Sequence, residues 1–213
     1  MSRVIIFANG LLPELEKALR LLHPDDLIVC ADGGTQHAFA LGLLPDLVIG
    51  DLDSLSSDQR QTLEQQNVRF ETYSSDKNET DLELAIQYTL NLNPNEVVIL
   101  GALGGRLDQT LGNIALLAGA STKLTKMRLD DGVEEILFCR AQVEIRGEPG
   151  EIVSLLPWGG TVEGVQTTGL KWPLNREPLY PDKTRGISNE MESHEASVSI
   201  ESGTLLVVHQ RHV

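Results

Sequence analysis

The chain of 213 residues predicts an α/β fold in its first half and an all-β fold in its second half. Two observations support this division. As far as about residue 120, short apolar runs alternate with segments in which apolar residues recur at helical spacing. From residue 123 onward the helical spacing disappears, and strand-like runs are broken by Gly, Asp and Pro. We therefore expect one domain at residues 1–122 and a second domain at residues 123–213.

Five strand-and-helix pairs account for the first half. Residues 4–8 are apolar and largely β-branched, which predicts a strand, and the segment after Pro13 carries leucines at the spacing of a buried helix face. The other strands and helices are expected at residues 27–31 and 35–41, 47–49 and 57–66, 68–73 and 80–90, and 97–100 and 107–118. Because right-handed crossovers lay helices on both faces of a sheet, this alternation predicts a Rossmann-like, mostly parallel sheet with flanking helices.

The second half contains strand-like runs at residues 126–145, 151–160 and 196–210. In the last run Val198 and Ile200 alternate with serines, which is the period of a strand with one buried face. Short strands separated by turn residues are typical of a sandwich or barrel, and we expect a C-terminal β-sandwich.

The charge balance excludes several classes of partner. Lys and Arg number 17 against 31 Asp and Glu, so the formal net charge is −14. A field of this sign repels phosphate backbones and anionic lipids, so we expect neither a nucleic-acid polymer nor a membrane as a partner. The sequence shows no apolar stretch of membrane-spanning length and no signal peptide, which predicts a cytoplasmic protein. Cys30 and Cys139 are expected to be reduced core residues, and the histidines lack the spacing of a zinc site.

Polar motifs follow four successive strands of the predicted sheet. They are ADGG at residues 31–34, GDLDSL at 50–55, SDKNETD at 75–81 and GALGGRLDQ at 101–109. Ligands of open parallel sheets bind outside the carboxyl ends of the strands, so these motifs are expected at one edge. Each also has a purely structural explanation: ADGG is a good turn, and residues 80–83 fit a helix capping box.

The motifs together are harder to explain as turns and caps. Asp51, Asp53 and Asp81 would bring three carboxylates to one place, which is unfavourable unless a cation or protons neutralise them. Carboxylate oxygens suit Mg²⁺, and Lys77 and Arg106 in the same loops suit phosphate oxygens. Glycines at 33, 34, 104 and 105 would let the backbone approach a ligand. The pattern therefore predicts a site for a magnesium-bound nucleoside triphosphate.

These motifs resemble those of the thiamine pyrophosphokinase family, particularly its bacterial members. The resemblance is carried by ADGG, LPDLVIGDLDSL, DKNETDLELAI and GALGGRLDQTLGNIALL in the first half, and by TGLKWPL and GISNE in the second. It covers nearly the whole chain in the right order. The departures are Leu52, where an aromatic residue is expected, and Asn78, where an acid is expected.

The resemblance implies an N-terminal domain that binds MgATP and a C-terminal sandwich that binds thiamine, in a homodimer whose active sites at the subunit interface use both protomers. It implies transfer of the terminal two phosphates of ATP to the hydroxyethyl oxygen of thiamine, which gives thiamine diphosphate and AMP. Asp51, Asp53 and Asp81 are then the metal ligands and, with Arg106, the catalytic residues. The expected nucleotide-binding residues are Asp32, Gly33, Gly34, Lys77, Thr80, Arg106, Asp108 and Gln109, and the expected thiamine-binding residues are Lys171, Trp172, Ser188 and Asn189.

Two points stay open at the level of sequence. Either Asp81 or Asp53 could accept the proton of the alcohol. Trp158 and Trp172 are candidates to stack on thiamine, but either could instead be a core residue of the sandwich.

Other functions account for less of the sequence. A metal-dependent nucleotide-sugar transferase with a DxD motif would explain GDLDSL but not GALGGRLDQ or the β half. In a haloacid-dehalogenase-type phosphatase the DxD motif should follow the first strand, whereas here it follows the third. A non-catalytic sensor of thiamine or nucleotide would bind its ligand without turnover.

Overall fold

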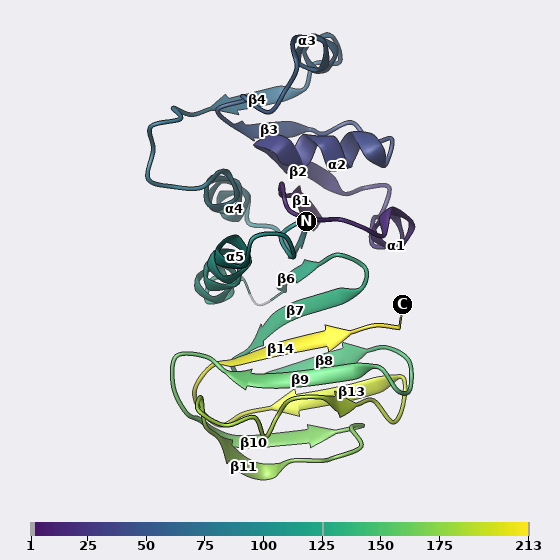
Figure 1. Cartoon of the computed structure of the whole chain (residues 1–213), viewed down its shortest axis with the longest axis vertical. Coiled ribbons are helices and arrows are strands. Elements are labelled where there is room, and N and C mark those ends of the chain that lie inside the picture. Colours follow the sequence, from purple (N-terminus) through teal and green to yellow (C-terminus); the bar gives the residue numbers. More distant parts are fainter. Residues whose placement is uncertain (1–2, 125, 213) are drawn as a thin grey trace. The chain divides into compact units, whose positions relative to one another are not determined.

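The computed structural model describes residues 3–124 and 126–212 and divides into two compact units, Met1–Gly132 and Val133–Val213, which we describe one at a time (Figure 1). The sequence suggests a division after residue 122. The difference is strand β6 (Met127–Asp130), which pairs in parallel with β5 (Glu96–Leu100) and so belongs to the first unit.

The first unit is built on the expected parallel sheet. Its strand order is β4-β3-β2-β1-β5-β6, and every pairing is parallel. The remaining strands are β1 (Arg3–Phe7), β2 (Leu27–Ala31), β3 (Leu47–Gly50) and β4 (Arg69–Thr72). The chain adds β2, β3 and β4 on one side of β1 and then β5 and β6 on the other. The carboxyl ends of β1 and β5 are therefore the topological switch point, where open sheets of this kind bind ligands.

Helices cover both faces of this sheet, as the alternating pattern predicts. They are α1 (Leu15–Leu19), α2 (Thr35–Ala40), α3 (Ser57–Gln65), α4 (Asp81–Asn91) and α5 (Leu107–Ala120), with a 3₁₀ turn η1 (Asp32–Gly34) before α2. Ile5 and Phe7 of β1 share a core with Ala18 of α1 and Leu63 of α3. The alternate residues of β1 point to the opposite face, and α4 packs on β1, β2 and β3.

The second unit is a β-sandwich, as predicted. One antiparallel sheet has the order β12-β9-β14-β7 and the other β11-β10-β13-β8. Its strands are β7 (Glu134–Cys139), β8 (Gln142–Arg146), β9 (Ile152–Pro157), β10 (Val162–Thr168), β11 (Asn175–Leu179), β12 (Asn189–Glu190), β13 (Glu195–Ser199) and β14 (Leu205–Gln210). Val153 and Val207 of the first sheet share one buried cluster with Val165 and Val198 of the second. The apolar core therefore lies between the sheets.

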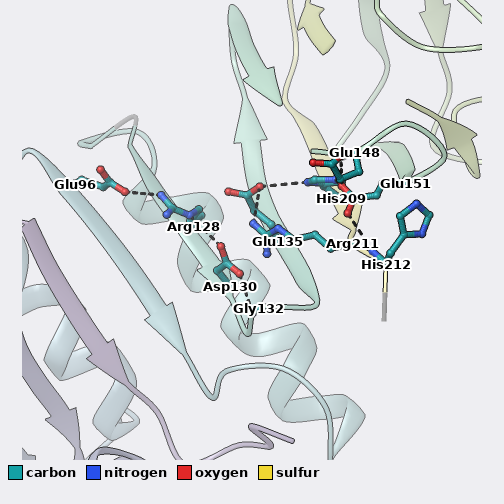
Figure 2. A network of polar contacts seen from close by, with 10 residues as sticks. All are labelled: Glu96, Arg128, Asp130, Gly132, Glu135, Glu148, Glu151, His209, Arg211 and His212. Carbon is teal, nitrogen blue, oxygen red and sulfur yellow. Dashed lines mark hydrogen bonds and ion pairs between the residues drawn. The ribbon is translucent and has the colours of Figure 1, made fainter. Parts of the chain in front are cut away.

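A buried histidine lies between two carboxylates in the second unit. His209 is 1% exposed; its Nε2 lies 2.8 Å from Glu151 Oε2, and its Nδ1 lies 3.5 Å from Glu135 Oε2 (Figure 2). Glu151 also accepts hydrogen bonds from the backbone N–H groups of Glu148 and His212. Burial raises the pKa of Glu151, but these two N–H donors and His209 outweigh burial and hold that pKa below its usual value.

Both cysteines are buried and free, as expected of reduced core residues. Burial raises the pKa of the Cys30 thiol to about 12 and that of the Cys139 thiol to about 11, so neither is primed to react. Within the described ranges, no helix has both the length and the apolar character needed to cross a membrane.

Candidate functional site

Loops that follow the first five strands line one cavity of about 600 Å³ in the first unit. Nine residues that the sequence singles out lie in its wall: Asp32, Asp51, Lys77, Thr80, Asp81, Gly104, Gly105, Arg106 and Gln109. The prediction that the strand-end motifs gather at one edge is therefore confirmed. Gly33, Gly34, Asp53 and Asp108 are not part of the wall.

Three carboxylates cluster at one end of this edge. Asp32, Asp51 and Asp53 each present an oxygen, and these oxygens lie within 4.8 Å of one another. Between Asp51 and Asp53, Leu52 has a buried side chain and a left-handed backbone with φ of 64°. The backbone N–H of Asp53 donates to Asp51 Oδ1 at 3.2 Å, so Asp51 also shapes the turn. GDLDSL thus combines a turn with a carboxylate cluster.

The third member of the cluster differs from the expected one. The sequence suggests Asp81 beside Asp51 and Asp53, whereas the structure groups Asp32 with them. Asp81 Oδ1 instead lies 2.8 Å from Lys77 Nζ. The pKa of Lys77 is raised, above all by this contact with Asp81 and further by the charges of Asp51 and Asp32, while burial works against the rise.

Gly50 explains why residues of different loops can lie so close together. A Cβ atom at this position would come within 2.8 Å of Asp32 Cβ and 3.0 Å of Asp81 Oδ1. Its φ of 148° is also one that L-residues rarely adopt. The glycine of GDLDSL therefore makes room for the side chains of the neighbouring loops.

Thr80 and Asp81 begin helix α4. The Thr80 side chain accepts a hydrogen bond from the backbone N–H of Glu83 at 3.2 Å, as the capping motif predicts. The Glu83 side chain accepts from Gln87 Nε2 at 3.2 Å, so the structure shows the Thr80 half of the capping box. Asp81 lies in the first turn, where the helix dipole favours a negative charge. Capping therefore accounts for Thr80, and the cavity wall also contains it.

Arg106 and Asp108 form a bidentate pair at the start of α5. The distances are 3.1 Å from Nε to Oδ1 and 2.5 Å from Nη2 to Oδ2. The two side chains are 72% and 66% exposed, so the pair is open to solvent. The Arg106 guanidinium holds the pKa of Asp108 below its usual range. Arg106 is thus positioned at the cavity by a partner that an anionic ligand could replace.

Gly33 and Gly34 are explained by packing. A Cβ on Gly33 would lie 2.4 Å from the Asn9 side chain, and one on Gly34 would lie 2.0 Å from the carbonyl oxygen of Phe7. The preceding residue, Asp32, has an unusual positive φ of 40°. The two glycines therefore let η1 pack closely against the end of β1, which carries Asp32 into the cavity.

The sequence reasoning missed two amide side chains of the cavity, Asn9 and Asn113. Asn113 Nδ2 donates to the carbonyl oxygen of Ala102 at 2.8 Å. One signal could have found it: Asn113 follows Gln109 by four residues, so both lie on the same side of α5. Asn9 has no comparable motif around it.

The carboxylate cluster fits a hard divalent cation. Asp32 is only 6% exposed, and its Oδ1 is buried with no hydrogen-bond partner among the described residues. A buried carboxylate oxygen without a donor is costly unless a cation satisfies it. Oxygen ligands with open access suit Mg²⁺, so the residues present fit the metal that the sequence predicts.

In the second unit, Asn189 holds the backbone of Trp172. Asn189 Oδ1 accepts from Trp172 N–H at 3.1 Å, and its Nδ2 donates to Trp172 O at 2.7 Å. Trp172 is 46% exposed, so it is not a core residue. Lys171 Nζ lies 4.7 Å from the ring centroid of Trp172 and 2.6 Å from Glu190 Oε2. The expected thiamine residues Lys171, Trp172 and Asn189 thus form one connected cluster.

The other two candidates of this unit have structural partners. Ser188 has a positive φ of 59°, and its backbone N–H donates to Ser154 Oγ at 3.0 Å. Trp158 packs edge-on against Phe138, with ring centroids 5.6 Å apart. Trp158 therefore contributes to the packing of the sandwich.

Comparison with known proteins identifies the family. Residues 18–129 match the family model described as thiamin pyrophosphokinase, catalytic domain, and residues 141–205 match that described as thiamin pyrophosphokinase, vitamin B1 binding domain. The first match spans more than half of the chain. The chain belongs to the thiamine pyrophosphokinase family. The family resemblance that the motifs suggest is therefore confirmed.

Relatives within the thiamine pyrophosphokinase family match along most or all of their length. A thiamine pyrophosphokinase of Bacillus subtilis is 32% identical over 185 residues, covering 85% of this chain and 86% of that protein. The crystal structure of the thiamine pyrophosphokinase from Bacillus subtilis matches with a TM-score of 0.88 at 28% identity, with 100% of both chains covered. That of a thiamin pyrophosphokinase family protein from Enterococcus faecalis matches with a TM-score of 0.82 at 28% identity, again covering 100% of both chains. The predicted fold class is thereby confirmed.

Proposed function

We propose that this chain is an enzyme that transfers the pyrophosphoryl group of ATP to the hydroxyethyl oxygen of thiamine. The observation that carries the proposal is that Asp32 and Asp51 line one cavity with Lys77, in the domain that matches the catalytic family model, and that Asp53 lies beside these two aspartates. The thiamine hydroxyl oxygen forms a bond to the β-phosphorus of ATP. The bond from this phosphorus to the α–β bridging oxygen breaks, and AMP leaves with that oxygen.

The carboxylate cluster would hold Mg²⁺ through Asp51, Asp53 and either Asp32 or Asp81. The bound ion would neutralise charge on the phosphoryl oxygens as it develops. The buried, unpartnered Oδ1 of Asp32 supports a role for Asp32 that the sequence reasoning had not assigned to it. Asp81 or Asp53 would accept the proton that the thiamine hydroxyl loses.

Basic and polar side chains of the cavity would position the phosphates. Lys77 and Arg106 supply positive charge, and Arg106 can exchange Asp108 for a phosphate with the same bidentate geometry. Thr80 and Gln109 offer a hydroxyl and an amide to the same ligand. Transfer of this kind depends on positioning and charge neutralisation more than on a covalent catalyst, so the chain needs no nucleophile.

Thiamine is a cation with an aminopyrimidine ring, and we propose that Trp172 gives it a stacking surface. Support comes from the exposure of Trp172 and from Asn189, which hydrogen-bonds to both the backbone N–H and the carbonyl oxygen of Trp172. The Lys171 ammonium lies 4.7 Å from the centroid of the Trp172 ring. This cation–π contact supports the proposal that the ring can bind a cationic ligand. Ser188 and Glu190 flank this cluster in the chain, and Ser188 remains a proposed thiamine contact.

Two further statements belong to the same proposal. On the basis of the family resemblance, we propose a homodimer with active sites at the subunit interface. Size-exclusion chromatography coupled to light scattering tests this proposal. A mass near 23.3 kDa, which is that of one chain, would contradict it. We also propose a cytoplasmic enzyme, since ATP is the co-substrate and two unpaired, buried cysteines suit a reducing compartment.

A product assay tests the proposed function. Purified protein supplied with Mg²⁺, ATP and thiamine is expected to form thiamine diphosphate and AMP in equal amounts. ADP with thiamine monophosphate would contradict pyrophosphoryl transfer. Ligand binding with no turnover at all would favour the sensor instead, and turnover of a nucleotide sugar supplied in a separate reaction would favour the glycosyltransferase.

A further inference from the structure

Asn113 lies in the cavity wall with its amide orientation fixed by the backbone. Its Nδ2 donates to the carbonyl oxygen of Ala102 at 2.8 Å. A carbonyl oxygen can only accept, so this contact must be made by the amide NH₂ group and not by Oδ1. Oδ1 is therefore directed away from Ala102, and it is an acceptor that Asn113 can offer to a ligand.

Asn113 and the carboxylate cluster lie at opposite ends of the cavity edge. Asp51 follows β3 and Asp32 follows β2, whereas Ala102, the partner of Asn113, follows β5. In the strand order β3-β2-β1-β5, three strand spacings separate β3 from β5, which corresponds to about 14 Å. A nucleoside triphosphate whose phosphates lie at the carboxylates would extend along this edge toward β5, so that its base comes near Asn113.

The β5 end has the character of a base-binding site. Ala8, Leu11 and Ala102 line it together with Arg106 and Gln109, and the exposed Leu11 side chain supplies most of its apolar surface. Leu11 is 56% exposed, and a Cβ on Gly104 would lie 3.1 Å from the Leu11 side chain, so glycine keeps the space beside Leu11 open. An apolar side chain beside an oriented amide can recognise a heterocyclic base. This end is also the topological switch point of the sheet.

We propose that Asn113 determines the base specificity of the nucleotide donor, with Oδ1 accepting a hydrogen bond from the exocyclic amine of adenine. This inference rests on the proposed function, because that function makes ATP the ligand of the cavity. Guanine and hypoxanthine carry an oxygen in place of the amine, and two acceptors would then face each other. A base without either group would leave Oδ1 unsatisfied.

The test compares ATP with purine riboside triphosphate, which lacks only the amine. The wild-type protein is expected to prefer ATP by roughly tenfold in kcat/KM. Asn113→Leu, which is similar in size but has no acceptor, should reduce this preference to within about twofold. A purely structural role of Asn113 would lower the rates with both donors equally and leave their ratio unchanged, which would overturn the proposal.

Thr110→Ala is a matched control on the same helix. The Thr110 hydroxyl contacts the carbonyl oxygens of Gly104 and Arg106, at 3.3 and 3.2 Å, so its loss loosens the same loop. We expect this variant to keep the wild-type ratio between the two donors. If the Asn113 variant fails to fold, the wild-type preference decides alone: equal use of the two donors overturns the proposal.

The same comparison made by binding separates this inference from the proposed function. Calorimetric titration of each nucleotide with Mg²⁺ needs no turnover. Tighter binding of ATP that Asn113→Leu abolishes supports the inference even if no thiamine diphosphate forms. Product formation without discrimination between the two nucleotides would overturn the inference and leave the proposed function in place.

Discussion

Lys77 Nζ lies 2.8 Å from Asp81 Oδ1, and the carboxylates of Asp51 and Asp32 are near enough to help raise the pKa of the lysine. Lys77 therefore stays charged over the whole range in which an ATP-dependent enzyme works. A raised pKa stabilises the folded state at pH values below the unfolded value of about 10.4, and this contribution is lost as pH rises through the folded pKa.

We expect Lys77→Met to raise the KM for ATP and to lower kcat by about a hundredfold, because the proposed phosphate contact and the partner of Asp81 are lost together. Initial rates at varied ATP measure both effects. Lys123→Met removes a lysine that does not line the cavity and should change neither. Wild-type values of KM and kcat in the Lys77→Met variant would contradict a role of Lys77 in the site.

The carboxylate cluster predicts that Asp32 matters as much as Asp51. We expect Asp32→Asn and Asp51→Asn each to lower turnover by roughly a hundredfold or more and to weaken Mg²⁺ binding, since each removes one of the proposed negative ligands. Metal titrations in the presence of ATP check the binding directly. Asp58→Asn changes an exposed aspartate of the first turn of α3 and should leave both quantities unchanged. Full activity of Asp32→Asn would favour Asp81 over Asp32 as the third ligand of Mg²⁺.

The two tryptophans are expected to behave differently. Trp172→Ala should raise the KM for thiamine about tenfold or more, with a much smaller effect on the KM for ATP, because it removes an exposed stacking surface. Trp158→Ala should lower the free energy of unfolding through loss of its contact with Phe138 and affect both KM values equally. Steady-state kinetics and urea denaturation separate the two. A larger rise in the KM for ATP than for thiamine in Trp172→Ala would argue against stacking.

We expect the stability of the second unit to decrease at acid pH because of Glu151. Because its pKa is lowered in the folded state, its ionised form stabilises the fold above the unfolded value of about 4.3, and this contribution is lost as pH falls through the folded pKa. Glu151→Gln should therefore be less stable than wild type at pH 7, and the difference should shrink below about pH 4. Both tryptophans lie in the second unit, so their fluorescence during urea denaturation reports this unit.

Exposed Glu144 provides the comparison for Glu151. Glu144→Gln should show wild-type stability at both pH values, because its carboxylate lies on the surface of β8. A difference between wild type and Glu151→Gln that stays constant with pH would show that the loss comes from packing and not from ionisation.

Much of this architecture was predictable from local patterns. Short apolar runs and helical spacing locate the strands and helices of the first unit, and strand ends rich in Asp and Gly locate the cavity. β6 was not assigned to the parallel sheet, because a short strand such as Met127–Asp130 looks the same whether its partner is parallel or antiparallel. Pairing between distant strands leaves little trace in one sequence.

The site was predicted in its residue types more accurately than in its contacts. The sequence places Asp32 and Asp81 on the same edge, but only the left-handed backbone of Asp32 brings its carboxylate to Asp51. Likewise, Gly33 and Gly34 resemble ligand-binding glycines, while their neighbours show that they serve packing. Asn113 lies within the motif GALGGRLDQTLGNIALL, but nothing in the sequence distinguishes it as a cavity residue, because its position depends on the contact of α5 with Ala102 after β5.

The most direct test of the central claim follows one phosphorus atom. ATP labelled in its β-phosphate is incubated with thiamine, Mg²⁺ and the purified protein, and the products are separated. Pyrophosphoryl transfer places the label in thiamine diphosphate and releases unlabelled AMP, and Asp51→Asn should suppress this transfer. Label recovered in ADP, with an unlabelled thiamine monophosphate, would contradict the proposed function.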